Sequence, residues 1–226
     1  MRLFALFLFF CLSTLANASS NNEKLAQLLL NHSAASSEGK DDVAQFNSGL
    51  RALAKENNRE SQFLLGVQAM TGAIGGAEGI LWLHKAERNG CSGAAGILGR
   101  MYLDGMGGVQ KDEAMGLKWT RNAAERGEIM SQVFLAAQYL HGENHVPKDL
   151  VQAYSWMYQA SKAAADEPAI VFALNPQIKM LESSLTSTQI QEAQKLADDR
   201  IRKIGGVPRY VCAQILPMHP LSSNSK

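Results

Sequence analysis

Cysteine is scarce in this sequence, and neither sign of charge is in clear excess. The 226 residues contain three cysteines, at positions 11, 91 and 212, with no C-x-x-C pair. This excludes a small disulfide-rich scaffold and the common cysteine-based zinc motifs. Basic residues number 22 and acidic residues 21, which gives a formal net charge of +1. Nucleic-acid and anionic-membrane surfaces need a basic excess, so we predict neither kind of partner.

Long hydrophobic runs are also missing, except at the N-terminus. Arg2 precedes an apolar run from Leu3 to Leu12, and Ala16-Asn17-Ala18 supplies the small residues of a cleavage site. A charge, a short apolar run and small residues are typical of a secretory signal peptide, which we place at residues 1–18 with a cut after Ala18. The run is too short for a stable membrane span. We therefore predict a periplasmic or secreted protein with no membrane insertion after cleavage.

Catalytic and cofactor motifs are missing as well. The sequence has no G-x-S-x-G elbow and no P-loop, and the glycine-rich stretch 72–79 follows a predicted helix rather than a strand. His141, Glu143 and His145 form the only cluster of metal-ligand residue types, without the H-E-x-x-H spacing of zinc proteases. We predict no catalytic residue, no metal and no cofactor, and hence no enzyme.

Two cysteines, Cys91 and Cys212, remain after cleavage of the signal peptide. An exported compartment permits a disulfide between them, which would require the C-terminal tail to fold back onto the rest of the chain. The alternative is a pair of buried, inert thiols. The sequence leaves both alternatives open.

A fixed period runs through the middle of the sequence. Trp82, Trp119 and Trp156 are its only tryptophans, and each lies 37 residues from the next. Periods of about 20–50 residues indicate a solenoid of stacked units. We predict three units, preceded by a degenerate one. Their boundaries are 41–58 for the degenerate unit and then 59–90, 92–127 and 129–165, within a repeat region spanning 41–165.

Each unit predicts two helices. The first ends at Gly105 or Gly142, where a left-handed cap needs glycine. The second follows an aspartate N-cap, Asp112 or Asp149, and carries the tryptophan with an alanine four residues later. Because that spacing puts the large ring and the small side chain on one face, we predict core packing rather than a ligand box. If Trp119 is fully buried, its replacement by alanine should cost about 3–5 kcal/mol.

The repeat region is flanked by less regular segments. Residues 19–40 predict a flexible N-terminal segment with a short helix near Glu23–Leu30. Residues 166–204 predict C-terminal capping helices, and residues 205–226 an unstructured tail.

Within the capping region, prolines and an amphipathic pattern determine the prediction. Pro168 and Pro176 break the helical pattern. Residues 186–204 then predict one amphipathic helix, capped by Ser187 or Thr188, whose charged face closes the stack.

The second unit carries a dense motif. Its positions are Leu98, Gly99, Tyr102, Gly105, Gly108, Val109, Lys111, Asp112, Ala114, Trp119, Ala123, Ala124 and Gly127. This pattern resembles the Sel1-like repeat, a short relative of the tetratricopeptide repeat, in the form found in exported bacterial proteins. The resemblance covers roughly residues 41–204. It implies an all-α, right-handed α-α superhelical solenoid whose relatives are mostly adaptors that assemble complexes.

Comparison of the units separates packing positions from surface positions. Two positions on the first helix change character from unit to unit and lie on one face, because residues i and i+4 are neighbours. They hold Val67, Arg100 and Ala137, and four residues later Thr71, Asp104 and His141. In related solenoids this helix lines the concave side, so the resemblance implies that Arg100, Asp104 and His141 bind a partner. The alternative is an ordinary solvated face.

The leading functional prediction is an exported, non-enzymatic scaffold for protein–protein interaction. Two alternatives stay open. One is an envelope enzyme, or the regulator of an enzyme, that acts on cell-wall material. The other is a host-directed effector or entry factor, which the residues do not separate from the first prediction.

Overall fold

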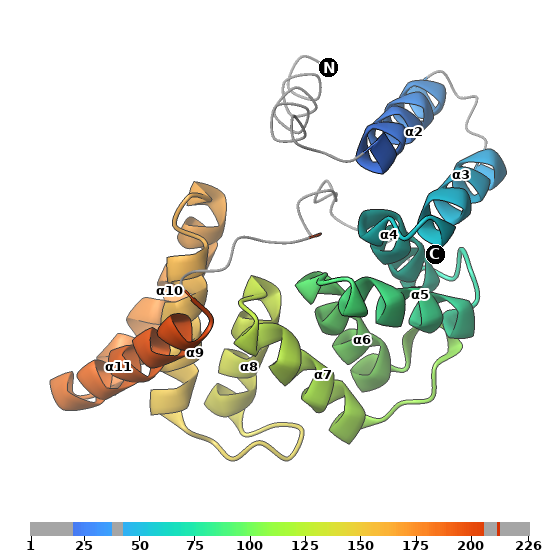
Figure 1. Ribbon diagram of the computed structural model, residues 1–226. Coiled ribbons are helices and arrows are strands. Elements are labelled where there is room, and N and C mark those ends of the chain that lie inside the picture. Colours follow the sequence, from blue (N-terminus) through green and yellow to red (C-terminus); the bar gives the residue numbers. More distant parts are fainter. Residues whose placement is uncertain (1–19, 38–42, 206–211, 213–226) are drawn as a thin grey trace.

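The computed structural model describes residues 20–37, 43–205 and 212, and nearly all of the regular structure in these ranges is α-helix. The helices are α2 (Ser20–Ser37), α3 (Val43–Lys55), α4 (Arg59–Met70), α5 (Gly76–Arg88), α6 (Ser92–Asp104), η2 (Met106–Gly108), α7 (Glu113–Glu125), α8 (Ile129–His141), α9 (Leu150–Ala163), α10 (Pro168–Ser184) and α11 (Ser187–Lys203). Figure 1 shows them following one another along a curved row, from α2 at one end to α10 and α11 at the other. The predicted all-α solenoid is confirmed.

The helices of each predicted unit form a pair. These pairs are α4 with α5, α6 with α7, and α8 with α9, and α3 occupies the degenerate unit. Small residues let the paired helices approach closely: a Cβ atom on Gly66 would overlap Leu83, and one on Gly99 would overlap Thr120. Close backbone approach therefore depends on glycine at these two crossings.

The caps predicted within the units are present. Gly105 and Gly142 end α6 and α8 in the left-handed conformation, with φ of 69° and 76°. The side chains of Asp112 and Asp149 accept hydrogen bonds at 2.8 and 3.0 Å from the third backbone N–H of α7 and α9. Because these contacts are local, each helix boundary follows from its own short sequence.

The tryptophans divide into two classes. Trp82 and Trp156 are 8% and 5% exposed and belong to the hydrophobic clusters of the chain, as predicted. Trp119 is only partly buried but packs against the cluster that contains Trp82, so it contacts the core as predicted without being fully covered.

The N-terminal flank is more ordered than predicted. Helix α2 spans Ser20–Ser37 and replaces the predicted flexible segment with its short helix at Glu23–Leu30. Leu25 is 3% exposed and joins the cluster formed with α3 and α4, so apolar packing orders the segment despite its Ser- and Asn-rich composition. The predicted signal peptide, residues 1–18, lies outside the described residues.

The C-terminal flank also differs from the prediction. Helix α10 starts at Pro168 and continues through Pro176 instead of breaking there. Leu174 and Leu181 bury one face of this helix against the last unit, and this packing outweighs the backbone bond that a proline removes. Helix α11 is capped by Thr186 in a capping box, rather than by Ser187 or Thr188.

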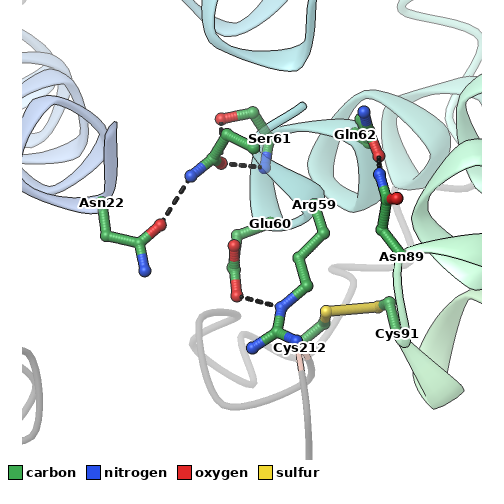
Figure 2. Close-up of polar contacts among 9 residues, drawn as sticks. Asn22, Arg59, Glu60, Ser61, Gln62, Asn89, Cys91 and Cys212 are labelled. Atoms are coloured by element: carbon green, nitrogen blue, oxygen red, sulfur yellow. Dashed lines mark hydrogen bonds and ion pairs between the residues drawn. A yellow bond between two sulfur atoms is a disulfide. The ribbon is translucent and has the colours of Figure 1, made fainter. Parts of the chain in front are cut away.

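A disulfide joins Cys91 and Cys212, whose Cα atoms are 5.5 Å apart, and decides between the two alternatives left open by the sequence. Cys91 takes the N-cap position of α6, where the first helices of the other two units have Asn58 and Glu128 as caps. Figure 2 shows the bond together with the hydrogen bonds at the start of α4. Cys212 is 6% exposed, and the rest of the predicted tail beyond Gly205 lies outside the described residues.

Candidate functional site

The predicted partner-binding residues lie on α6 and α8. Arg100 Nε is 3.1 Å from Asp104 Oδ2, and both side chains are about half exposed. His141 is the last residue of α8 and is exposed. The structure thus brings Arg100 and Asp104 together in an ion pair within one helix. It records no contact between that pair and His141 in the ranges it describes, and their role in binding stays a prediction.

A groove of about 770 Å³ runs along a different element, the second helix of the second unit. We call it the α7 groove. Most of its lining comes from α7, with contributions from α5 and from the loop between α8 and α9. The lining residues are Glu87, Ala114, Leu117, Lys118, Trp119, Arg121, Asn122, Glu125, Asn144 and His145.

Helical spacing places the α7 residues along one face. Ala114, Lys118, Arg121 and Glu125 follow each other at intervals of three or four, and Asp112 fixes where the helix begins. Trp119 contributes apolar surface to the lining, together with Leu117. The groove therefore combines a partly exposed indole with a row of polar and charged side chains.

His84 of α5 contacts the Trp119 ring. The ring of His84 meets it edge-on, with 5.1 Å between the ring centroids. Burial of His84 lowers the pKa of its imidazole, and the nearby Arg88 charge lowers it further. The neutral ring is therefore the favoured partner of Trp119 at neutral pH.

Two fixed edges bound the α7 groove. Glu87 receives a hydrogen bond from Arg126 Nη1 at 2.7 Å, which ties α5 to the end of α7. On the other edge, Asn144 and His145 have left-handed backbones with φ of 50° and 62°. Such conformations cost non-glycine residues about 1–3 kcal/mol and are held by their surroundings. Here Asn144 Nδ2 donates to Gln138 Oε1 at 2.6 Å, which helps to hold the loop.

The two cations inside the groove are available for a ligand. Lys118, Arg121 and Glu125 have no ion pair within 4 Å among the described residues, whereas Glu87 is engaged by Arg126. At the edge, His145 Nε2 lies 3.7 Å from Glu113 Oε2, and Lys111 lowers the pKa of Glu113 through a close hydrogen bond. Two unpaired cations against one unpaired acid leave the groove with a positive balance.

Sequence reasoning missed this site because it compared only the first helices of the units. The same comparison on the second helices carries a signal. The position before the tryptophan changes from Leu81 to Lys118 to Ser155, while the tryptophan stays constant. A variable residue beside an invariant anchor indicates a surface that differs from unit to unit.

The described residues lack a metal cluster and a membrane-spanning helix. Across 20–37, 43–205 and 212, no group of three or more His, Cys, Asp and Glu side chains is placed to hold a metal ion, and this includes His141, Glu143 and His145. None of the described helices combines the length and apolar character that a membrane span requires. The lining of the α7 groove offers apolar surface, donors and acceptors, which suits recognition of another molecule.

Comparison with known proteins identifies the repeats. The Sel1 repeat model matches residues 93–128 and 129–164. A solved Sel1 repeat protein from Oxalobacter formigenes is 23% identical with a TM-score of 0.57, over 78% of this chain and 73% of that one. At this identity the likeness shows the fold alone. No curated protein matched the chain.

A second solved structure is a protective antigen present in uropathogenic Escherichia coli strains, which displays an SLR fold. It is 24% identical with a TM-score of 0.43, over 80% of this chain and 46% of that one. The chain thus spans less than half of that protein's length. The residues that match the Sel1 repeat model coincide with the helix pairs α6–α7 and α8–α9. The chain therefore contains two tandem Sel1 repeats at its centre.

Proposed function

We propose that this protein is an exported, non-catalytic scaffold that binds a protein partner through the α7 groove. Sel1 repeats generally mediate protein–protein interactions, which supports the scaffold class. The observation that carries the proposal is the exposed part of Trp119, at a repeat position where the other two tryptophans are buried. Tryptophan and arginine are enriched among residues that dominate binding energy, and the groove offers Trp119 beside Arg121.

Export is supported by two features of different kinds. Residues 1–18 have the charge, apolar run and small residues of a cleavable signal. The disulfide between Cys91 and Cys212 suits an oxidising compartment such as the periplasm or the extracellular space, since cytosolic thiols are kept reduced.

Export is tested by fractionating cells that express the full chain. We expect the protein outside the cytosol, with an N-terminus at Ser19 and both remaining cysteines protected from alkylation until a reductant is added. Full-length protein in the cytosol with freely alkylated Cys91 and Cys212 would contradict the export proposal.

The site is tested by partner capture from an envelope extract with the mature chain. Lys118→Glu with Arg121→Glu should abolish capture of the specific partner, because charge reversal on a binding surface costs several kcal/mol of binding through repulsion. The matched control is Arg100→Glu with His141→Glu, which alters the other predicted surface. Loss of capture only in this control would place the partner on α6 and α8 and overturn the α7 groove as the site.

Both double variants change exposed residues, so their melting temperatures should stay close to that of the unaltered chain. A melting curve for each variant therefore separates lost binding from lost folding.

A further inference from the structure

The face of α9 that corresponds to the α7 groove is covered by another helix of the same chain. A shift of 37 residues converts Lys118, Trp119 and Asn122 into Ser155, Trp156 and Gln159. Lys118 and Asn122 are exposed, whereas Ser155 and Gln159 are 0% and 1% exposed. Because α7 and α9 occupy equivalent places in their units, the difference in exposure comes from the neighbouring element that packs on each face.

Helix α11 is what covers this face of α9. Its Arg200 guanidinium lies 3.8 Å from the centre of the Trp156 ring. Arg200 Nη2 donates to Ser155 Oγ at 2.6 Å, and Nη1 donates to Gln159 Oε1 at 3.1 Å. Burial lowers the pKa of Arg200 to about 10, because the guanidinium packs against α9.

Two alanines and one arginine form the face of α11 that packs on α9. Ala193 and Ala197 are fully buried, and Arg200 follows three residues after the second alanine. Residues i, i+4 and i+7 lie on one helical face, so α11 presents two small apolar side chains and one charge to α9. Small residues let α11 lie close to α9.

We propose that the α7 groove receives an amphipathic helix of a partner protein in the way that α9 receives α11. This inference rests on the proposed function and specifies the ligand of the same site. The partly exposed ring of Trp119 takes the place of Trp156, and a pair of small apolar residues one turn apart packs on its accessible part. Helix-in-groove recognition of this kind is a common use of an apolar helix face.

The charge of the partner helix follows from the side chains that α7 presents. On α9, the neutral acceptors Ser155 and Gln159 receive the cation of Arg200. The α7 groove instead presents Lys118 and Arg121, both without an ion pair in the part of the chain that the structure covers. The partner helix therefore carries aspartate or glutamate at the place of Arg200.

The same charges decide against a second copy of this chain as the occupant. The α11 helix of another copy would bring Arg200 against Lys118 and Arg121, and like charges repel. Glu125 lies one turn beyond Arg121 and pairs with nothing within 4 Å among described residues, so it restricts the partner's acid to the level of Lys118 and Arg121.

The test uses α11 itself as the probe. Two labelled peptides cover residues 186–204, one with the native sequence and one with Arg200→Glu, both held helical by a cross-link on the charged face because short helices are marginal in water. Their binding to the mature full chain is measured by fluorescence anisotropy. We expect the Glu peptide to bind at least about tenfold more tightly than the native peptide.

Receptor variants make the outcome specific. Lys118→Glu with Arg121→Glu should reverse the preference between the two peptides, and Trp119→Ala should weaken both. Arg100→Glu, on the opposite helix of the unit, should change neither affinity. Equal binding of the two peptides, or a preference that survives the Lys118 and Arg121 reversal, would overturn the inference.

Failure of this inference is distinguishable from failure of the proposed function. If neither peptide binds but partner capture is still lost in the Lys118 and Arg121 variant, the groove binds a segment that is not such a helix, and the inference is wrong. If capture also persists in that variant, the proposed site itself is wrong.

Discussion

The three tryptophans occupy the same position of the repeat but have different neighbours. Trp82 is buried and carries Lys85 of its own helix over its ring, with 4.3 Å between Nζ and the ring centre. Trp156 is buried beneath Arg200 of α11. Trp119 has no cation over its ring in the described residues and is partly exposed. The role of each tryptophan is therefore decided by the side chain that packs on its ring, because the residue itself is the same in all three units.

Replacement of two of these tryptophans should separate stability from binding. Trp156→Ala should lower the free energy of unfolding by about 3–5 kcal/mol, the usual cost of removing a buried aromatic ring. Trp119→Ala should cost clearly less, because part of its ring is already in water. Urea unfolding of both variants measures the difference, and equal losses would show that Trp119 is as well packed as Trp156.

His84 should make stability depend on pH. Burial lowers the pKa of its imidazole below the ordinary value of 6.5, so the unfolded chain binds a proton more readily than the folded one. Unfolding is therefore favoured as pH falls through 6.5, and the loss levels off below the folded-state pKa.

The measurement compares urea unfolding at pH 7.5 and pH 5 for the unaltered chain and for His84→Gln, which cannot titrate. The variant should lose less stability over this interval than the unaltered chain. An identical loss in both would exclude His84 as a contributor.

At the scale of helices, α11 departs from the repeat. A regular fourth unit would pair α10 with α11, but α11 packs chiefly on α9. Its contact face combines buried Ala193 and Ala197 with Arg200, and Gln152 Oε1 also accepts from Arg200 Nη2 at 3.2 Å. Helix α11 thus closes the stack by covering the face of α9 whose equivalent on α7 is open.

Arg200 should be the residue that holds α11 in place. Arg200→Ala removes hydrogen bonds from a charged donor, each worth about 1.5–3 kcal/mol. Arg200→Lys should not restore them, because an ammonium lacks the planar fork and stacks poorly on Trp156. Amide hydrogen exchange in α11 should speed up in both variants. Arg202→Lys, an exposed control on the same helix, should leave it unchanged; unaltered exchange in Arg200→Lys would contradict the positioning role.

At the scale of the whole molecule, one covalent bond spans half of the chain. Cys91 and Cys212 are 121 residues apart, and their bond links the start of α6 to the C-terminal segment. A cross-link over such a loop limits the unfolded ensemble, and loss of a native disulfide typically costs about 2–5 kcal/mol.

The double variant Cys91→Ser with Cys212→Ser should therefore unfold at a lower urea concentration than the oxidised protein. Reduction of the unaltered chain should produce a shift of similar size, whereas reduction of the double variant should produce none. Equal stability of oxidised and reduced protein would mean that the bond contributes little to the fold.

The sequence by itself determined the repeat architecture. The 37-residue spacing of the tryptophans, the glycines at 105 and 142 and the aspartates at 112 and 149 were enough to predict the helix pairs and most of their boundaries. These signals are readable because they act within a few residues: a cap or a left-handed turn depends on its immediate neighbours.

Only the tertiary structure decided the rest. The docking of α11 on α9, the open face of α7 and the pairing of Cys91 with Cys212 all join residues far apart in the chain. Helix α10 also continues through Pro176, because apolar packing outweighs a local signal. Local chemistry thus determines where each helix begins and ends, and long-range packing decides which equivalent faces are covered and which remain open.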